Sequence, residues 1–231
     1  ISQKVAAVAP ESIAADEKGT VRNDSEQSTS VKNADSGESL VPDDNSGSND
    51  EEMRGVWIPY MSLQLSESER SEAAFREKIC NMLDTCVSHK LNTIIIHVRP
   101  FGDAVYPSKY YPWSHIISGE QGKGVDFDPL QIIIEEAHNK KIAVHAWLNP
   151  FRISTGKTPS VLSQDNPYIQ WKNDKNKDND SYAFTYEDGI YYDPAYSEVR
   201  KLIINGVREI AENYNLDGIQ IDDYFYPSED E

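Results

Sequence analysis

The sequence predicts an α/β protein: a parallel (β/α) barrel of TIM type, of which about the first four strands are present, preceded by a disordered acidic tether. Apolar runs suited to buried strands alternate with apolar stripes at helical spacing. We find no hairpin signal between successive strands, so the sheet is expected to be parallel with right-handed crossovers. In addition, polar side chains gather toward the carboxyl ends of the expected strands.

Residues 1–52 are predicted to be a linker, and residues 53–231 the N-terminal half of the barrel. The first 52 residues hold 12 acidic and 4 basic side chains, and their aliphatic residues are scattered singly. Such a segment buries too little apolar surface to offset the chain entropy lost on folding. The formal net charge of the chain is −17, which disfavours nucleic acid and anionic membrane surfaces as partners. No apolar segment has the length of a membrane span.

The periodicity predicts four strands separated by three helices. We expect the strands at residues 54–61, 92–100, 141–150 and 217–227. Three apolar stripes at helical spacing lie between them. The residues that mark these stripes are Phe75, Ile79, Met82 and Cys86, then Leu130, Ile133, Ile134 and Ala137, then Val199, Leu202, Ile203, Gly206, Val207 and Ile210.

Each helix has a predicted start signal. Ser66 and Glu69 form a capping box ahead of the first helix. The pairs Asp128-Pro129 and Asp193-Pro194 place an N-cap and a first-turn proline before the second and third helices. An open, doubly wound sheet is the alternative architecture. Its nucleotide-binding version needs a glycine-rich turn after the first strand, and residues 61–64 contain no glycine, which favours the barrel.

Strand alternation predicts which side chains face the barrel interior. In each of the last three strands one face is continuously apolar, and the other gathers polar residues toward its carboxyl end. Barrel enzymes bind their substrates at that end. We therefore expect one polar cavity mouth, although these groups could instead satisfy one another inside the barrel. The expected lining residues are His97, Arg99, His145, Trp147, Asn149, Gln220, Asp222 and Tyr224.

Four motifs, in this order, resemble the bacterial glycosyl-hydrolase-like family 10. They are RGVWIPYM, HVRPFGDAVYPSKYYPWSHIISG, HAWLNPFRI and DGIQIDDYFYP, and together they extend from about Met53 to Pro227. The resemblance implies a (β/α) barrel and a family with secreted and lipoprotein members, some implicated in cutting peptidoglycan glycan strands. The stretch 218–222 is also similar to the Gly-x-Arg-x-Asp strand of α-amylase-like glycosidases, in which the Asp is the nucleophile. Here Gln220 replaces the Arg, and Asp222 matches the nucleophile.

The expected function is that of a glycoside hydrolase acting on a bacterial cell-wall or other extracellular polysaccharide. Asp222 is the expected catalytic carboxylate, and a second carboxyl group is required across the sugar. We expect that second group beyond residue 231, and hence that this chain alone is an inactive enzyme. The expected substrate-binding residues are His97, Arg99, Tyr106, Trp113, His145, Trp147, Asn149, Arg152, Gln220, Asp223 and Tyr224.

Several of these assignments have structural alternatives. The aromatic loop at 101–113, which includes Tyr106 and Trp113, could stack on sugar rings or pack onto itself. Arg99 and Arg152 could bind an acidic sugar or form internal ion pairs. Asp223 has the opposite parity to Asp222 and could cap a loop or hold a basic neighbour.

Two other functions compete with the hydrolase. One is a non-catalytic carbohydrate-binding barrel. The other, less favoured, is a metal-dependent hydrolase in which His97, His145 and Asp222 meet at an ion, although no ligand pair has tight spacing. We expect no cofactor and no metal, a polysaccharide partner such as peptidoglycan glycan strands, and an extracellular or cell-surface location.

Overall fold

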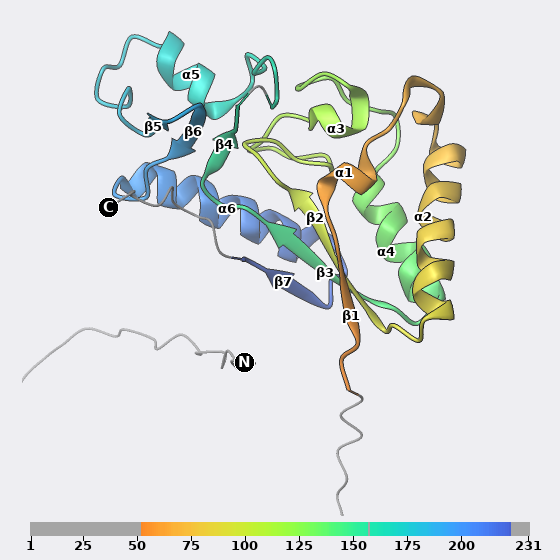
Figure 1. Cartoon of the computed structure of the whole chain (residues 1–231). Coiled ribbons are helices and arrows are strands. Elements are labelled where there is room, and N and C mark those ends of the chain that lie inside the picture. Colours follow the sequence, from red (N-terminus) through yellow and green to blue (C-terminus); the bar gives the residue numbers. More distant parts are fainter. Residues whose placement is uncertain (1–51, 157, 223–231) are drawn as a thin grey trace, which may run out of the picture. The chain divides into compact units, whose positions relative to one another are not determined.

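A computed structural model describes residues 52–156 and 158–222. Apart from Glu52, the predicted disordered tether lies outside the described residues. Asp223 and Tyr224, two predicted site residues, lie outside them as well. The described part contains a parallel sheet in the order β1–β2–β3–β7 (Figure 1). Its strands are β1 (Gly55–Ile58), β2 (Thr93–Arg99), β3 (Ala143–Leu148) and β7 (Gly218–Gln220). This confirms the predicted α/β class and the sequential, parallel pairing of its strands.

Three long helices make the crossovers between these strands and cover one face of the sheet (Figure 1). They are α2 (Glu72–Ser88), α4 (Pro129–Asn139) and α6 (Ser197–Asn213). In β3 the burial alternates: Val144, Ala146 and Leu148 are buried and their neighbours are half-buried. The buried set faces the helices, and the half-buried set faces the barrel interior.

The helix starts agree with prediction at one of three places. Asp128 caps α4, because its carboxylate accepts hydrogen bonds from the backbone N–H groups of Leu130 and Gln131. The Ser66–Glu69 capping box exists, but it starts the short 3-10 helix η1 (Glu67–Glu69), and Ser71 caps α2 instead. Asp193 accepts from the N–H of Ala195 in a turn, so α6 begins later than predicted. In both wrong cases a local side-chain hydrogen bond forms a turn before the helix begins.

A second, antiparallel sheet contradicts the expectation that hairpins are absent. It has the order β4–β6–β5 and lies in the chain between β3 and α6 (Figure 1). Its strands are β4 (Arg152–Ser154), β5 (Ala183–Tyr186) and β6 (Gly189–Tyr192), and α5 (Pro167–Asn173) accompanies them. Two short helices, α1 (Tyr60–Leu63) and α3 (His115–Ser118), follow β1 and β2. No helix in the described ranges is long and apolar enough to cross a membrane.

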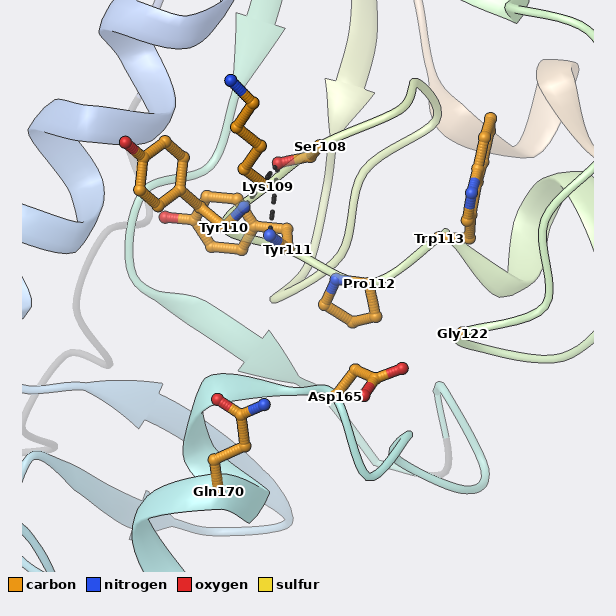
Figure 2. Close-up of a pocket in the computed structure, with 9 residues that line it drawn as sticks. All are labelled: Ser108, Lys109, Tyr110, Tyr111, Pro112, Trp113, Gly122, Asp165 and Gln170. Carbon is orange, nitrogen blue, oxygen red and sulfur yellow. Dashed lines mark hydrogen bonds between the residues drawn. The ribbon is translucent and has the colours of Figure 1, made fainter.

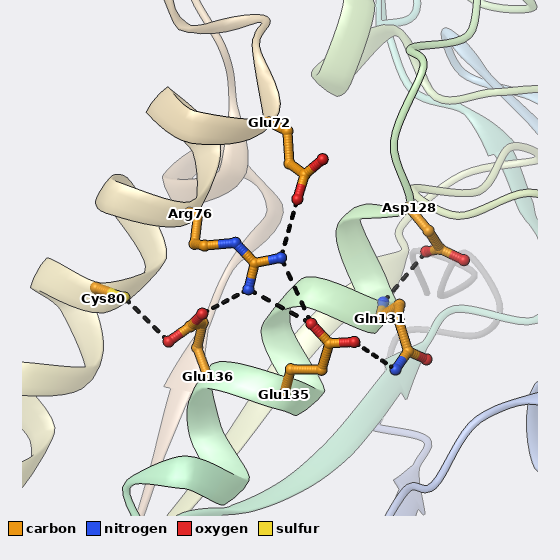
Figure 3. Close-up of polar contacts among 7 residues, drawn as sticks. All are labelled: Glu72, Arg76, Cys80, Asp128, Gln131, Glu135 and Glu136. Atoms are coloured by element: carbon orange, nitrogen blue, oxygen red, sulfur yellow. Dashed lines mark hydrogen bonds and ion pairs between the residues drawn. The ribbon is translucent and has the colours of Figure 1, made fainter.

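A surface network joins α2 to α4. The Arg76 guanidinium forms ion pairs with Glu72, Glu135 and Glu136, and the Cys80 thiol donates a hydrogen bond to Glu136 (Figure 3). Hydrogen bonding to Glu136, followed by that to Glu72, raises the pKa of Arg76. The network therefore favours the charged forms of Arg76 and Glu136, and it links α2 to α4 at a fixed position.

Replacing Arg76 with Met should lower the free energy of unfolding by about 1 kcal/mol, because three carboxylates lose a shared partner at a site that is still 34% exposed. Thermal unfolding at low and high salt measures the effect. The loss should shrink in 1 M NaCl, since screening weakens exposed ion pairs in the original protein. Arg208→Met, which removes an exposed hydrogen bond to Asn205 on α6, is the control. An equal, salt-independent loss in both variants would contradict this account.

Candidate active site

The inward face of the parallel sheet is ordered in two levels by strand register. Trp57, Ile95 and His145 are in register at the first level. His97, Trp147 and Gln220 are in register at the second, closer to the carboxyl ends of the strands. Strand alternation therefore brings His97, His145, Trp147 and Gln220 to one face, as the sequence predicts.

An aromatic cluster forms the centre of this face. We use that name for Trp57, Tyr60, His97, Phe101 and Trp147. The His97 ring stacks on Trp147 with centroids 3.6 Å apart, and Trp57 meets Trp147 edge to face at 4.9 Å. Tyr60 contacts both His97 and Phe101 edge to face. Trp57 is 46% exposed, so the cluster presents an open aromatic surface.

His97 is held in the neutral form. Burial, and then the nearby charge of Arg152, lowers the pKa of its imidazole to about 3. Within the described chain neither ring nitrogen has a hydrogen-bond partner. At ordinary pH the ring can therefore present one N–H donor and one acceptor, and it adds no positive charge to the site.

His145 is oriented by its neighbours on β7. Its Nδ1 lies 2.9 Å from the Nε2 of Gln220. The ring lies directly over Gly218, where an added Cβ would come within 2.8 Å of two imidazole atoms. Gln220 stands where α-amylase-like strands have Arg, and in this chain its amide bonds His145. A larger residue at position 218 would force His145 out of this position.

Asp222 lies two residues past the end of β7 and has the same strand parity as Gln220. The residue is half-buried, and among the described groups none forms a hydrogen bond with its buried Oδ1 atom. Burial lowers the pKa of Arg152, and the charges of Tyr60, Tyr191 and Asp222 oppose that shift. The carboxylate therefore lies within electrostatic range of the arginine at the carboxyl end of the sheet.

Asn149 and Arg152 shape the turn from β3 into β4. The Asn149 side-chain oxygen accepts a hydrogen bond from the Arg152 backbone N–H at 3.1 Å. The Arg152 Nε donates to the carbonyl of Pro100, and its guanidinium lies 5.1 Å from the Phe101 ring centroid. Asn149 is thus a turn residue that places Arg152 beside the aromatic cluster.

Arg99 does not face the interior, which corrects the parity prediction. The register shifts between His97 and Arg99, so Arg99 pairs with Leu148 on the helix-facing side. Its guanidinium lies 4.5 Å from the Tyr111 ring centroid and against Gly206 of α6. At 1% exposure it belongs to the layer between sheet and helices. An irregularity of this kind reverses the face of every residue that follows it in the strand.

Tyr106 also lies outside the barrel mouth, with none of its surface exposed. Its ring meets Tyr214 edge to face. The same loop is fixed to α6, because the Glu209 carboxylate accepts hydrogen bonds from the Ser108 hydroxyl and the Lys109 backbone N–H. The sequence leaves two alternatives for this loop, stacking on sugar rings or packing against the protein. For Tyr106 the structure shows the second, because its side chain is fully buried. The loop fills the outer layer, where its buried ring cannot stack on a sugar.

Trp113 lines a different hollow. It borders a cavity of about 350 Å³ together with Tyr110 and Pro112 from its own loop and Asp165 and Gln170 from the segment after β4 (Figure 2). The tryptophan is half-buried. The substrate-binding role of Trp113 therefore stays a prediction. If it binds a sugar, it does so at this cavity and not at the aromatic cluster.

Three members of the aromatic cluster were not predicted as site residues: Trp57, Tyr60 and Phe101. Trp57 could have been found by extending strand alternation to the first strand, where it is in register with Ile95. Tyr60 begins the short helix α1, and Phe101 follows β2 outside any regular element, so strand alternation gives no direction for either. Among the residues that the structure describes, no three His, Cys, Asp or Glu side chains gather at one point.

Known proteins resemble this chain in sequence and fold. Glycosyl hydrolase YngK of Bacillus subtilis (strain 168) is 34% identical over 182 residues, which cover 77% of this chain and 34% of YngK. Glycosyl hydrolase DigH of Escherichia coli (strain K12) is 33% identical over 192 residues, covering 75% and 42% of the two chains. The chain thus spans less than half the length of either relative.

The fold is shared with a solved glycosidase barrel. Cyclic α-maltosyl-(1→6)-maltose hydrolase from Arthrobacter globiformis superposes with a TM-score of 0.50 at 10% identity, over 74% of this chain and 44% of that one. At this identity the likeness concerns the fold. The family model described as glycosyl hydrolase-like 10 matches residues 52–231. The chain therefore belongs to the glycosyl hydrolase-like 10 family.

Proposed function

We propose that the protein is a glycoside hydrolase in which Asp222 is a catalytic carboxylate. The observation that carries this proposal is the position of Asp222, two residues past β7 at the carboxyl end of the sheet and with the same strand parity as Gln220, which contacts His145. A carboxylate at this end of the strands can supply one of the two carboxyl groups that cleavage of a glycosidic bond requires. The family and the shared barrel fold support the same reaction class.

The surrounding side chains divide into binding roles. Trp57 offers an exposed ring on which the apolar face of a sugar can stack. The paired side chains of His145 and Gln220 offer hydrogen-bonding groups for sugar hydroxyls, and the buried His97 supports Trp147 from behind by stacking on it. The Arg152 guanidinium lies 5.1 Å from the Phe101 ring centroid, and it can stabilise Asp222 as a carboxylate or bind an acidic substituent of the substrate.

We propose an extracellular polysaccharide, such as the glycan strands of the bacterial cell wall, as the substrate. The net charge of −17 disfavours polyanions as partners, which leaves neutral or mixed-charge glycans. Both curated relatives are named glycosyl hydrolases. An extracellular or cell-surface location follows from this choice of substrate.

Replacing Trp57 with Ala should raise KM for the glycan up to about tenfold and change kcat little, because a stacking contact of about 1 kcal/mol is lost from binding. The assay is release of reducing ends from soluble glycan polymers by the intact protein. Trp57→Phe keeps an aromatic face and should stay within about threefold of the original KM. Since Trp57 is 46% exposed, its removal should leave the melting temperature nearly unchanged.

Two outcomes would revise the proposal. An unchanged KM in Trp57→Ala would remove Trp57 from the binding surface. Saturable glycan binding by the original protein with no release of reducing ends from any polymer would instead identify a non-catalytic carbohydrate-binding barrel.

A further inference from the structure

A second cavity lies beside the aromatic cluster but outside it. Its volume is about 330 Å³, and α1, α3 and the segment after β4 surround it. Tyr60, Gln64, His115, Thr158 and Ser160 are among the residues that line it. Tyr60 belongs to both sites, since its ring also contacts His97 and Phe101. A ligand in this cavity would therefore lie next to a ligand on the aromatic cluster.

A buried carboxylate orients the histidine of this cavity. The Oδ2 atom of Asp103, a residue with no exposed surface, lies 3.1 Å from the Nδ1 of His115. An acceptor at Nδ1 places the ring proton on that nitrogen in the neutral imidazole. The Nε2 of His115, which is 20% exposed in its side chain, is then the acceptor available to the cavity.

The carboxylate is itself held rigidly. Asp103 Oδ2 accepts a second hydrogen bond from the Nε2 of Gln121 at 3.0 Å. The side-chain oxygen of Gln121 accepts from the backbone N–H of Ser163 and from the Nδ2 of Asn166, which also donates to the carbonyl of Gly102. Asp103, Gln121 and Asn166 are all buried. His115 is therefore preorganised by a network that extends into the loop beyond β4.

The lining chemistry selects the type of ligand. Among the described lining residues there is no Lys, Arg, Asp or Glu; the polar groups are an amide, hydroxyls and an imidazole, and Tyr60 adds an aromatic ring. Amide, hydroxyl and imidazole groups beside an aromatic face suit a sugar ring better than an ion or a nucleotide phosphate. We propose that this cavity binds an outlying sugar unit of the glycan, with His115 Nε2 accepting a hydrogen bond from a sugar hydroxyl. This inference rests on the proposed function, because it takes the aromatic cluster as the main glycan site.

The test compares binding of β-1,4-linked N-acetylglucosamine oligomers, from dimer to hexamer, to the intact protein and its His115→Gln variant. The variant should bind the hexamer roughly threefold to tenfold more weakly, the loss expected for one hydrogen bond, and the dimer equally well. His89→Gln, at an exposed position that ends α2, is the matched control and should alter no affinity.

A site-specific readout separates this inference from the proposed function. In protein labelled at the histidine rings, the NMR signal that disappears in His115→Gln should shift with the hexamer and not with the dimer. Hexamer binding that shifts the signals of His97 or His145 but not that of His115, or equal hexamer affinity in the variant, would overturn the subsite and leave the glycosidase standing. A hexamer-induced shift at His115 without any turnover would support the subsite and overturn the hydrolase.

Discussion

Replacing Asp222 with Asn is expected to lower kcat by at least about 100-fold, with KM and thermal stability almost unchanged. The amide has nearly the shape of the carboxylate, but it carries no charge to attack C1, activate water or stabilise an oxocarbenium-like transition state. Because Asp222 is half-buried and lies two residues past the end of β7, the substitution removes little packing. The measurement is release of reducing ends by the intact protein under single-turnover and steady-state conditions.

The control for this substitution is Asp165→Asn. Asp165 borders the separate cavity beside Trp113 and should leave kcat unchanged (Figure 2). If Asp222→Asn kept near-normal kcat, Asp222 would have no catalytic role and the proposed chemistry would need another carboxylate. If it lost both activity and its cooperative melting transition, Asp222→Glu, which keeps the charge, would separate a folding effect from a catalytic one.

Replacing Gly206 with Ala should destabilise the protein, although the same change in an open helix position stabilises by roughly 1 kcal/mol. A Cβ at position 206 would come within 2.5 Å of both the Arg99 guanidinium and the Tyr111 ring. Both side chains are at least 95% buried and packed together, so neither can move away freely. Overpacking of this kind costs about 1–3 kcal/mol or more, which outweighs the gain in helix propensity.

The expected result for Gly206→Ala is a net loss of up to about 2 kcal/mol and a melting temperature lower by up to roughly 8 °C. Differential scanning calorimetry measures both. Ile204→Ala, on the exposed face of the same helix, is the control and should stay within about 0.5 kcal/mol. A more stable Gly206→Ala protein would mean that Arg99 and Tyr111 are not locked against α6.

The parts of the fold that could be predicted are those set by local chemistry. Asp128 caps α4 as expected, because its carboxylate accepts from the free N–H groups of the first helical turn; the same Asp-Pro pair at 193–194 forms a turn ahead of α6 instead. The inward position of His97 and Trp147 follows from simple alternation. The same rule gives the wrong face for Arg99, because the register between β2 and β3 shifts after His97. Such a shift depends on two paired strands and cannot be predicted from the sequence of one strand.

The sequence contains a hairpin signal for the antiparallel sheet that the prediction did not use. Aromatic and β-branched residues flank Glu187, Asp188 and Gly189, and the structure makes a two-residue turn at Glu187 and Asp188, after which Gly189 begins β6. The aromatic loop after β2 is a different case. Its composition predicts that the tyrosines either bind sugar rings or pack against the protein. Only the positions of α4 and α6 decide that Tyr106 and Tyr111 are buried. No local pattern carries that information.

The segment between β3 and α6 has a consequence for how relatives of this protein can diverge. The backbone N–H of Tyr192 donates a hydrogen bond to the carbonyl of Phe151, at 2.7 Å, so the segment leaves and rejoins the barrel at nearly the same point. An insert whose two ends meet can be lengthened, shortened or exchanged with little entropic cost and without moving the flanking strand or helix. Because Arg152, at one end, is also the cation beside the aromatic cluster, such exchanges would alter glycan preference while the barrel scaffold stays constant. We expect this segment to be the natural place for acquiring new specificities, and the first choice for grafting them by design.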